Sequence, residues 1–272
     1  MATQPQGRIR DGIGGWVFEP RRGPLYPEGL RQKREREHAA AHLGTIEINA
    51  TCCGSQKPES FARWRSETPD GFVFAAKGSS RYITNRRVLT EARPSIEKVF
   101  SGSVMDLNEK LGSINWPFSP TKAFDPTDFE AFLKLLPCSV EGVAIRHAVE
   151  VRHDSFRSPD FIALLQAYGV AAITAADGAD QPIAAVMAPF VDARSTGTHE
   201  DEPEGDPEAG LARWVQTAWK SATGEVPVDL ESVASEPAPA IAREVFLDVI
   251  SGANVRNPAA AMALTRRLAK SD

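Results

Sequence analysis

Acidic residues alternate with apolar ones in two short segments of the chain, Thr45–Asn49 and Ala148–Val151. In an extended strand, successive side chains point to opposite faces, so the apolar residues of each segment share one face. Glu47 and Glu150 then lie on the other face. A carboxylate held in such a position can act as a general acid or base. We therefore expect Glu47 and Glu150 to be catalytic, together with Lys77, which follows a third apolar segment.

Cationic and aromatic residues stand near the ends of the same kind of segment. Guanidinium groups bind phosphate and carboxylate, and an indole ring can stack on a ring or a sugar. The residues expected to bind substrate are Trp16, Asn49, Arg81, Trp116, Arg152, Asp177 and Arg194. No cofactor is implied. His38 and His42 are four residues apart on a predicted helix, but no third ligand accompanies them, so no metal site is predicted.

Eight β-type segments alternate with helical patterns along the chain. The predicted strands are Ile9–Gly15, Thr45–Asn49, Phe72–Ala76, Ser113–Trp116, Ala148–Val151, Ala171–Ala175, Phe190–Ala193 and Val245–Val249. The predicted helical segments are Arg31–Leu43, Pro58–Glu67, Val88–Leu111, Asp125–Leu136, Ser158–Tyr168, Gly210–Ala222 and Pro258–Leu268. This alternation predicts an α/β fold, a single (β/α)₈ TIM-type barrel over residues 1–272.

A doubly wound open sheet is the structural alternative. Such a sheet usually carries a glycine-rich phosphate-binding turn after its first strand. Here Gly12, Gly14 and Gly15 lie inside the predicted strand, with no helix behind them, so the barrel is favoured. A parallel barrel gathers the carboxyl ends of its strands at one mouth. We expect Glu47, Glu150, Arg152 and Arg194 to converge there, with Trp16 and Trp116 on the wall.

Seven motifs, in a fixed order over nearly the whole chain, resemble those of the YecE-like family, also called domain of unknown function 72. They are IGGW (13–16), LYPEGL (25–30), TIEINAT (45–51), the run 59–84, KLGSINWPF (110–118), RHAVEVRHDSF (146–156) and VRNPAAAM (255–262). The resemblance implies a (β/α)₈ barrel and no settled activity. It also adds Tyr26 to the substrate-binding candidates.

The chain departs from the family's pattern at three polar positions. Pro117 follows Trp116 where the family usually has Gln, and the segment after the seventh predicted strand, 194–197, lacks the usual His. Ile250 and Ser251 stand where paired Asn residues usually end the eighth strand. The resemblance therefore implies a divergent member, with altered specificity or weakened ancestral activity.

Composition limits the possible partners and location. The net charge of −5 gives no general attraction to nucleic acid or anionic membrane. No apolar run is long enough to span a bilayer, and residues 1–7 are polar and are expected to be a flexible N-terminus. With three cysteines and no signal peptide, a cytoplasmic protein is expected. The acidic segment 198–210 is predicted to be a mobile loop over the barrel mouth.

Two functions from different classes fit these features. The first is a hydrolase or lyase that acts on a small anionic substrate, either phosphorylated or sugar-like. The second is a non-catalytic binding protein for nucleic acid or a phosphorylated metabolite. A local basic cluster supports nucleic-acid binding, and Tyr82 beside it could stack on a base. The cluster consists of Arg81, Arg86, Arg87 and Arg93. Nothing in the sequence indicates the oligomeric state.

Overall fold

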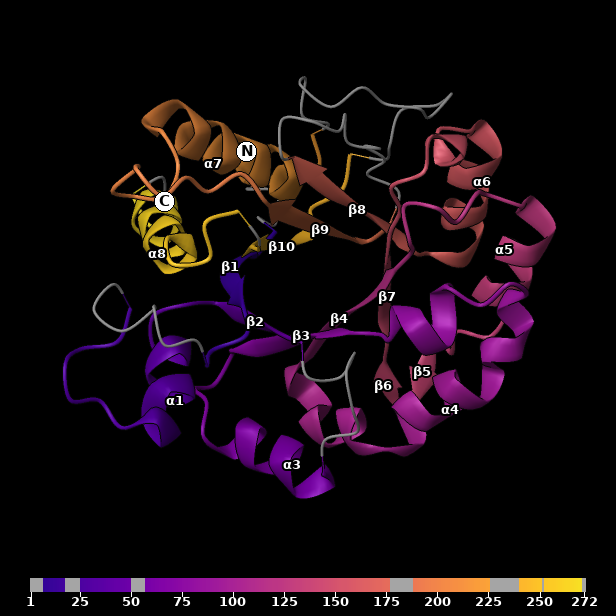
Figure 1. The fold of residues 1–272 in the computed structure, drawn as a ribbon, viewed down its shortest axis with the longest axis horizontal. Coiled ribbons are helices and arrows are strands. Elements are labelled where there is room, and N and C mark those ends of the chain that lie inside the picture. The colour runs from indigo at the N-terminus through magenta and orange to yellow at the C-terminus, as the bar shows by residue number, and fades with distance from the viewer. Residues whose placement is uncertain are drawn as a thin grey trace, which may run out of the picture.

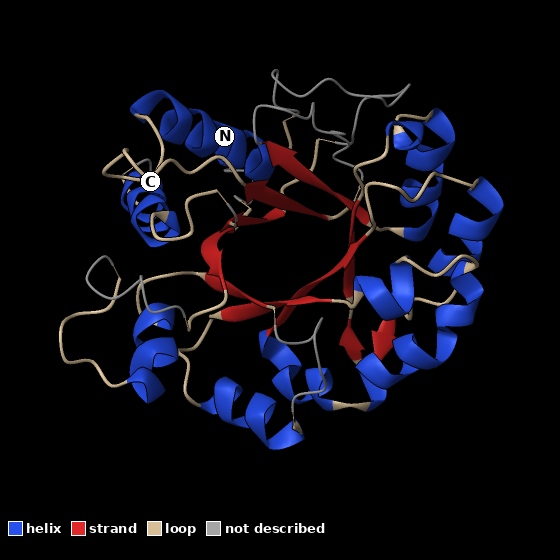
Figure 2. Cartoon of the chain, viewed as in Figure 1, coloured by secondary structure: helices blue, strands red, loops and turns tan. Residues whose placement is uncertain are grey.

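The computed structural model describes residues 7–17, 25–49, 57–176, 188–225, 240–250 and 252–270. Eight parallel strands form a closed barrel in the order β1-β10-β9-β8-β7-β4-β3-β2. Figure 1 looks along the barrel, with the strands as an inner ring and the helices around it (Figures 1 and 2). The strands are β1 (Ile9–Gly14), β2 (Thr45–Ile48), β3 (Val73–Lys77), β4 (Leu111–Pro117), β7 (Arg146–Glu150), β8 (Ala171–Ala176), β9 (Phe190–Ser195) and β10 (Glu244–Val249). The predicted (β/α)₈ barrel is confirmed.

The helices outside the barrel begin where the sequence provides helix-starting residues. Proline stands in the first turn of α3, α4, α5, α6 and α8, where its missing N–H costs no hydrogen bond. Ser158 caps α6 by accepting a hydrogen bond from the Asp160 backbone N–H at 3.2 Å. The α-helices are α1 (Glu35–Ala40), α3 (Pro58–Ser66), α4 (Arg93–Ser101), α5 (Pro126–Leu133), α6 (Pro159–Tyr168), α7 (Glu208–Thr223) and α8 (Asn257–Leu268).

Several predicted elements differ from the observed ones in detail. The helix predicted over 31–43 is a 3₁₀ turn, η2 (Gln32–Arg34), followed by the short α1. The segment predicted over 88–111 is divided into η4 (Leu89–Ala92), α4 and η5 (Ser103–Lys110). A hairpin of β5 (Ser139–Val140) and β6 (Val143–Ala144), which was not predicted, lies between α5 and β7. Its turn places Glu141 and Gly142 at φ of 50° and 81°, and two-residue strands are too short to show a periodic pattern.

Two layers of apolar side chains hold the barrel. Outward-facing strand residues such as Ile46, Phe74 and Ile114 are fully buried beneath the helices. The interior is filled by a smaller cluster that includes many alanines, with Phe190 and Phe246 as its bulkiest members. At the amino ends of the strands, Glu244 binds Arg10 and also accepts from Arg146 at 3.0 Å. Apolar packing and ion pairs therefore fill the lower part of the barrel, and the polar groups that remain lie toward the carboxyl ends.

The acidic segment 198–210 is attached to α8. Glu204 forms ion pairs of 2.6 Å with both Arg266 and Arg267, and Arg256 donates to the Glu200 carbonyl at 2.7 Å. Thr198 is buried and donates to Asn257 Oδ1 at 2.7 Å. The mutual repulsion expected within this segment is therefore offset, because α8 supplies the opposite charges, and its mobility stays a prediction.

Two other expectations concern the chain ends and membranes. Of the predicted flexible N-terminus, residues 1–6 lie outside the described residues, and Gly7 donates its N–H to the Ala222 carbonyl at 3.2 Å. Of the helices that the structure describes, none has the length and apolar character needed to cross a bilayer.

Candidate functional site

A buried guanidinium joins two carboxylates inside the carboxyl end of the barrel. Arg194, on β9, pairs with Glu47 of β2, and its Nη1 lies 3.1 Å from Oε2 of Glu150 on β7. All three side chains are at most 5% exposed. Arg194 therefore reaches across the barrel interior and connects strands that are not neighbours in the sheet. The predicted convergence of Glu47, Glu150 and Arg194 is what the structure contains.

Glu150 has a full set of donors. Its Oε1 accepts from Arg152 Nη2 at 2.6 Å, and its Oε2 accepts from Asn115 Nδ2 at 3.3 Å as well as from Arg194. The Arg152 side chain is 53% exposed, so this guanidinium lies at the boundary between the buried carboxylates and solvent. Both oxygens of Glu150 are thus fixed in place by cationic or amide donors.

Two further aspartates lie in the same interior and were not among the predicted site residues. The pKa of Asp192 is raised to about 7, mainly by burial. A 2.7 Å hydrogen bond from Ser113 acts against this shift, and the Glu150 carboxylate adds to it. Burial also raises the pKa of Asp248 well above its ordinary value, with Asp192 acting in the same direction and Arg194 against it. Burial therefore favours the protonated form of Asp248, which can donate a proton.

The strand pattern could have revealed these aspartates. Asp192 and Arg194 are two residues apart on β9, and Asp248 pairs directly with Arg194 in the register of β10. In β10, Phe246 and Asp248 alternate with Val245 and Leu247, which is the same signal that identified Glu47. Asn115 shares the inward face of β4 with Ser113 and was missed for the same reason.

Several buried polar atoms at this end have no hydrogen-bond partner among the described residues. They are Glu47 Oε1, Asn115 Oδ1, Asp248 Oδ1, Thr45 Oγ1 and Arg194 Nε. Buried polar atoms in folded proteins are almost always paired. The carboxyl end of the barrel therefore holds several hydrogen-bond acceptors and at least one donor that the described residues leave unpaired. We call Glu47, Asn115, Glu150, Arg194 and Asp248 the mouth cluster.

Lys77 and Asn49 lie at the solvent side of the mouth cluster. Lys77 ends β3, pairs in register with Asn115 and is partly exposed. Asn49 follows β2 and is exposed, with its Nδ2 close to Gly14 of β1. Asp177 lies outside the described residues. The cationic groups that remain accessible at the mouth are therefore Lys77 and Arg152.

The structure corrects the predicted position of both aromatic walls. Trp116 is fully buried and points away from the barrel interior, packing on Phe132 of α5 and donating to His147 Nδ1 at 3.1 Å. Strand alternation explains this, because its neighbour Asn115 points inward. Trp16 packs on Trp64 and Phe74, which lie in the layer between β3 and α3. Gly15 at φ 65° turns the chain outward before Trp16, so period-two reasoning does not reach this residue.

Tyr26 and Arg81 are also separate from the mouth cluster. Tyr26 is buried, and its hydroxyl donates to the Trp16 carbonyl at 2.6 Å, which fixes the chain after β1. Arg81 lies on the π-helical turn η3 (Ser80–Thr84) and sits 5.5 Å from the ring of the adjacent Tyr82, which is 50% exposed. Neither contacts Glu47, Glu150 or Arg194 in the described structure.

A metal site would need three or more ligating side chains in one group. Within the described ranges, His, Cys, Asp and Glu form no such group. His42 is instead bound to the His38 carbonyl through Nδ1 at 2.8 Å.

Comparisons with known proteins agree with this fold. The chain is similar to a DUF72 family protein from Thermotoga maritima MSB8, with a TM-score of 0.71 and 15% identity over 97% of this chain and 99% of that one. A DUF72 family protein from Enterococcus faecalis V583 gives a TM-score of 0.62 and 14% identity over 97% and 98% of the chains. A D-psicose 3-epimerase gives 0.53 and 12% over 96% and 98%. At these identities the likeness is one of fold.

No curated protein matches the chain. The family model described as "Protein of unknown function DUF72" matches residues 10–270. The motifs quoted from the sequence and the eight-stranded barrel lead to the same assignment. The chain therefore belongs to the DUF72 family.

Proposed function

We propose that this protein is an enzyme of the hydrolase or lyase class, acting by general acid–base chemistry on a small, anionic, hydroxyl-bearing substrate at the carboxyl end of the barrel. One observation carries the proposal. The mouth cluster combines buried carboxyl groups, among them Asp248 with a pKa that burial raises, with polar atoms that lack partners in the described structure. Pairs of carboxyl groups whose surroundings separate their pKa values are typical of acid–base sites.

Glu47 is the preferred base among the predicted catalytic residues. Its Oε1 has no hydrogen-bond partner among the described residues, whereas both oxygens of Glu150 accept from neighbouring side chains. A base needs a lone pair directed at the proton that it removes. In this proposal Glu150 fixes Arg194 and Arg152, and Asp248 is the acid, because burial raises its pKa.

The unpartnered atoms also indicate the substrate class. The acceptors Glu47 Oε1 and Asn115 Oδ1 require donors, which the hydroxyl groups of a sugar-like molecule provide. Arg152 and Lys77, at the solvent side, favour a phosphate or carboxylate on the same molecule. A sugar phosphate or sugar acid would satisfy both requirements.

A purely structural ion-pair network is the competing explanation. Buried ion pairs add little net stability compared with apolar side chains, so stability alone gives no reason for one cation among several carboxyl groups. The unpartnered atoms also argue against it, since a half-satisfied network weakens a core.

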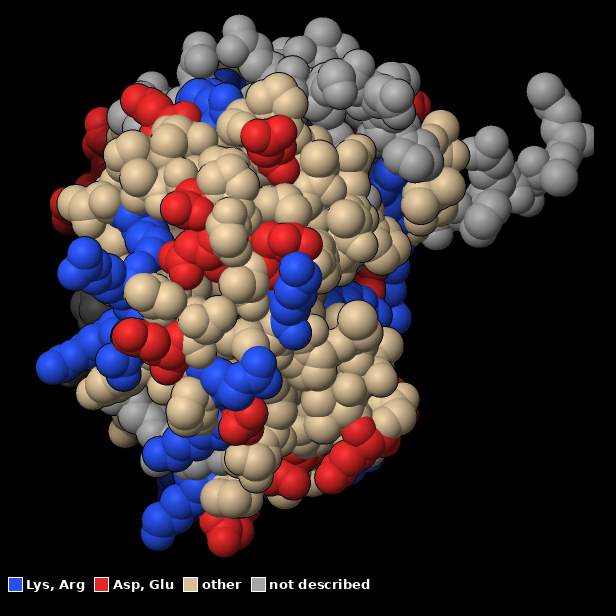
Figure 3. Space-filling model, turned by 90° about the vertical axis from the view of Figure 1, so that its right-hand side faces the viewer, with Lys and Arg blue, Asp and Glu red and all other residues tan. Residues whose placement is uncertain are grey.

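Nucleic-acid binding has less support. On the face drawn in Figure 3, Lys and Arg gather toward one edge, with Asp and Glu among them, so this face offers no continuous basic surface (Figure 3). Electrostatic binding to a nucleic acid backbone depends on such a surface.

The proposal is tested with the purified chain and a panel of chromogenic glycosides and phosphoesters, sugar phosphates and sugar acids. We expect turnover of at least one panel member, and loss of that turnover in the Glu47→Gln, Glu150→Gln double variant. Activity that persists in the double variant would refute the assignment. Saturable binding without turnover of any bound panel member would instead identify a binding protein.

A further inference from the structure

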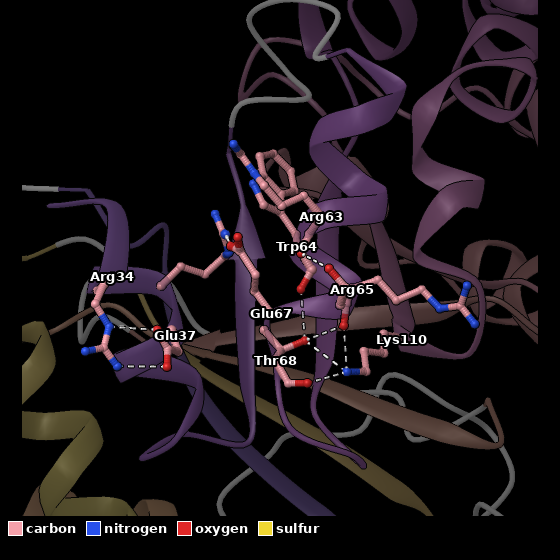
Figure 4. A network of polar contacts seen from close by, with 10 residues as sticks. Arg34, Glu37, Arg63, Trp64, Arg65, Glu67, Thr68 and Lys110 are labelled. Carbon is pink, nitrogen blue, oxygen red and sulfur yellow. Dashed lines mark hydrogen bonds and ion pairs between the residues drawn. The ribbon is translucent and has the colours of Figure 1, made fainter.

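A cleft of about 580 Å³ lies outside the barrel, between α1 and α3. Residues that follow β1, that belong to η2 and α1, and that lie on or directly after α3 line it. They are Trp16, Val17, Gln32, Lys33, Arg34, Arg36, Glu37, Arg63 and Glu67. Because Trp16 packs on Trp64 of α3, this cleft is separate from the mouth cluster inside the barrel. Figure 4 shows Arg34 of η2 and Glu37 of α1 on one side, and Arg63, Trp64 and Glu67 on the other.

The cleft is basic although the protein as a whole is acidic. Four cationic side chains line it, Lys33, Arg34, Arg36 and Arg63, against the two carboxylates Glu37 and Glu67. Arg34 binds Glu37 through two 3.0 Å hydrogen bonds, and Arg36 pairs with Glu67. Lys33 and Arg63 form no ion pair with any described residue. The lining therefore carries an excess of two positive charges.

Arg36 is held at the base of this lining with an unused donor. Its guanidinium lies 5.5 Å from the ring of Trp16 and 5.8 Å from the ring of Trp64, and the residue is only 6% exposed. Its Nε is buried and has no hydrogen-bond partner among the described residues. Burial and the nearby Arg63 lower the pKa of Arg36 to about 10, which leaves it charged at neutral pH. A buried cationic donor without an acceptor calls for an anion.

We propose that this cleft is a second site, which binds the phosphate group of a small phosphorylated metabolite. Lys33 and Arg63, which line the cleft, would bind the phosphate oxygens, and the Arg36 guanidinium in the same lining would add positive charge. The remainder of the ligand would pack on Trp16 and on Val17, which is 55% exposed. The cleft has the volume of an ordinary small-ligand pocket. A nucleotide and a sugar phosphate share this chemistry.

The test is isothermal titration of the full chain with inorganic phosphate, AMP and glucose 6-phosphate, and with adenosine and glucose as unphosphorylated controls. We expect saturable binding of the phosphorylated probes only. Arg63 is exposed, so Arg63→Glu leaves the core intact; the reversed charge should weaken binding about tenfold or more, or about 1.4 kcal/mol. Arg93→Glu is the control, because Arg93 is also an exposed arginine but lies on α4, away from the cleft, and it should bind as the wild type does.

The outcomes separate ligand sources and sites. Tighter binding of AMP than of glucose 6-phosphate would identify a nucleotide site, and equal binding of all three phosphorylated probes would show that the phosphate alone is recognised. Absence of saturable binding, or wild-type affinity in Arg63→Glu, would overturn the proposal. If Glu47→Gln abolished binding while Arg63→Glu did not, the ligand would sit at the mouth cluster instead. The proposed activity there can fail without affecting this result.

Discussion

Replacing Arg194 by Met should be among the most destabilising single changes in the chain. The substitution keeps an unbranched side chain but removes the cation that is buried between Glu47 and Glu150. At the 3.1 Å separation of Arg194 Nη1 from Glu150 Oε2, with an effective dielectric constant of about 20, one such pair contributes roughly 5 kcal/mol before desolvation. Removing one partner of a buried pair typically costs about 3–5 kcal/mol. We expect Arg194→Met to lower the free energy of unfolding by that amount.

Arg152→Met is the matched control, because Arg152 binds the same Glu150 carboxylate at 2.6 Å but is 53% exposed. Solvent screening limits such a pair to about 0–1 kcal/mol. Both variants are compared by equilibrium urea unfolding at pH 7, followed by circular dichroism. Adding Glu47→Gln and Glu150→Gln to Arg194→Met should restore part of the lost stability. Equal costs for the two arginines, or a cost below about 1 kcal/mol for Arg194→Met, would refute this account of the mouth cluster.

Three further predictions concern other parts of the fold. The pKa of Asp192 is raised to about 7 in the folded protein, so protonation of Asp192 stabilises the fold. This contribution to the free energy of unfolding is complete below the unfolded pKa near 3.8 and is lost as pH rises through about 7. The stability of the wild type relative to Asp192→Asn should therefore fall between pH 4 and 7 by up to about 1.4 kcal/mol per pH unit in urea titrations, and a pH-independent difference would contradict the assignment. Gly78→Ala should lower the free energy of unfolding by about 1–3 kcal/mol, because a Cβ there overlaps the ring of Trp116. Gly197 has open space around it, so Gly197→Ala should change the same free energy by no more than about 0.5 kcal/mol in the same unfolding assay. Glu204→Ala should speed hydrogen exchange in residues 198–210 through loss of its two arginine partners, and Asp201→Ala should not; equally fast exchange in the wild type would show that these ion pairs do not hold the segment.

Strand alternation made most of the barrel and the centre of the site predictable. In Thr45–Ile48 the same period of two that buries Ile46 and Ile48 under the helices turns Glu47 inward, and the rule holds for Glu150 and Arg194. Applied to every strand, it would also have identified Asp248 and rejected Trp116. The directions of both side chains therefore follow from the period of two in the sequence.

Other features depend on tertiary contacts that no local pattern contains. The direction of Trp16 follows from a left-handed Gly15, and a glycine permits that conformation without requiring it. The acidic segment 198–210 binds arginines about sixty residues later in the chain. Its local composition does not contain these contacts and, taken alone, predicted a mobile loop. The raised pKa of Asp192 likewise arises from burial, which only the closed barrel produces.

The central claim is that Glu47 performs chemistry at the mouth cluster, and one comparison tests it most directly. Glu244 is also an ion-paired carboxylate inside the barrel, but it lies at the amino ends of the strands with Arg10 and Arg146. The measurement is kcat for the best panel substrate in Glu47→Gln and in Glu244→Gln, each assayed well below its melting temperature. The account predicts a loss of about 10²-fold or more for Glu47→Gln and a value near that of the wild type for Glu244→Gln. Equal activities in the two variants would contradict it.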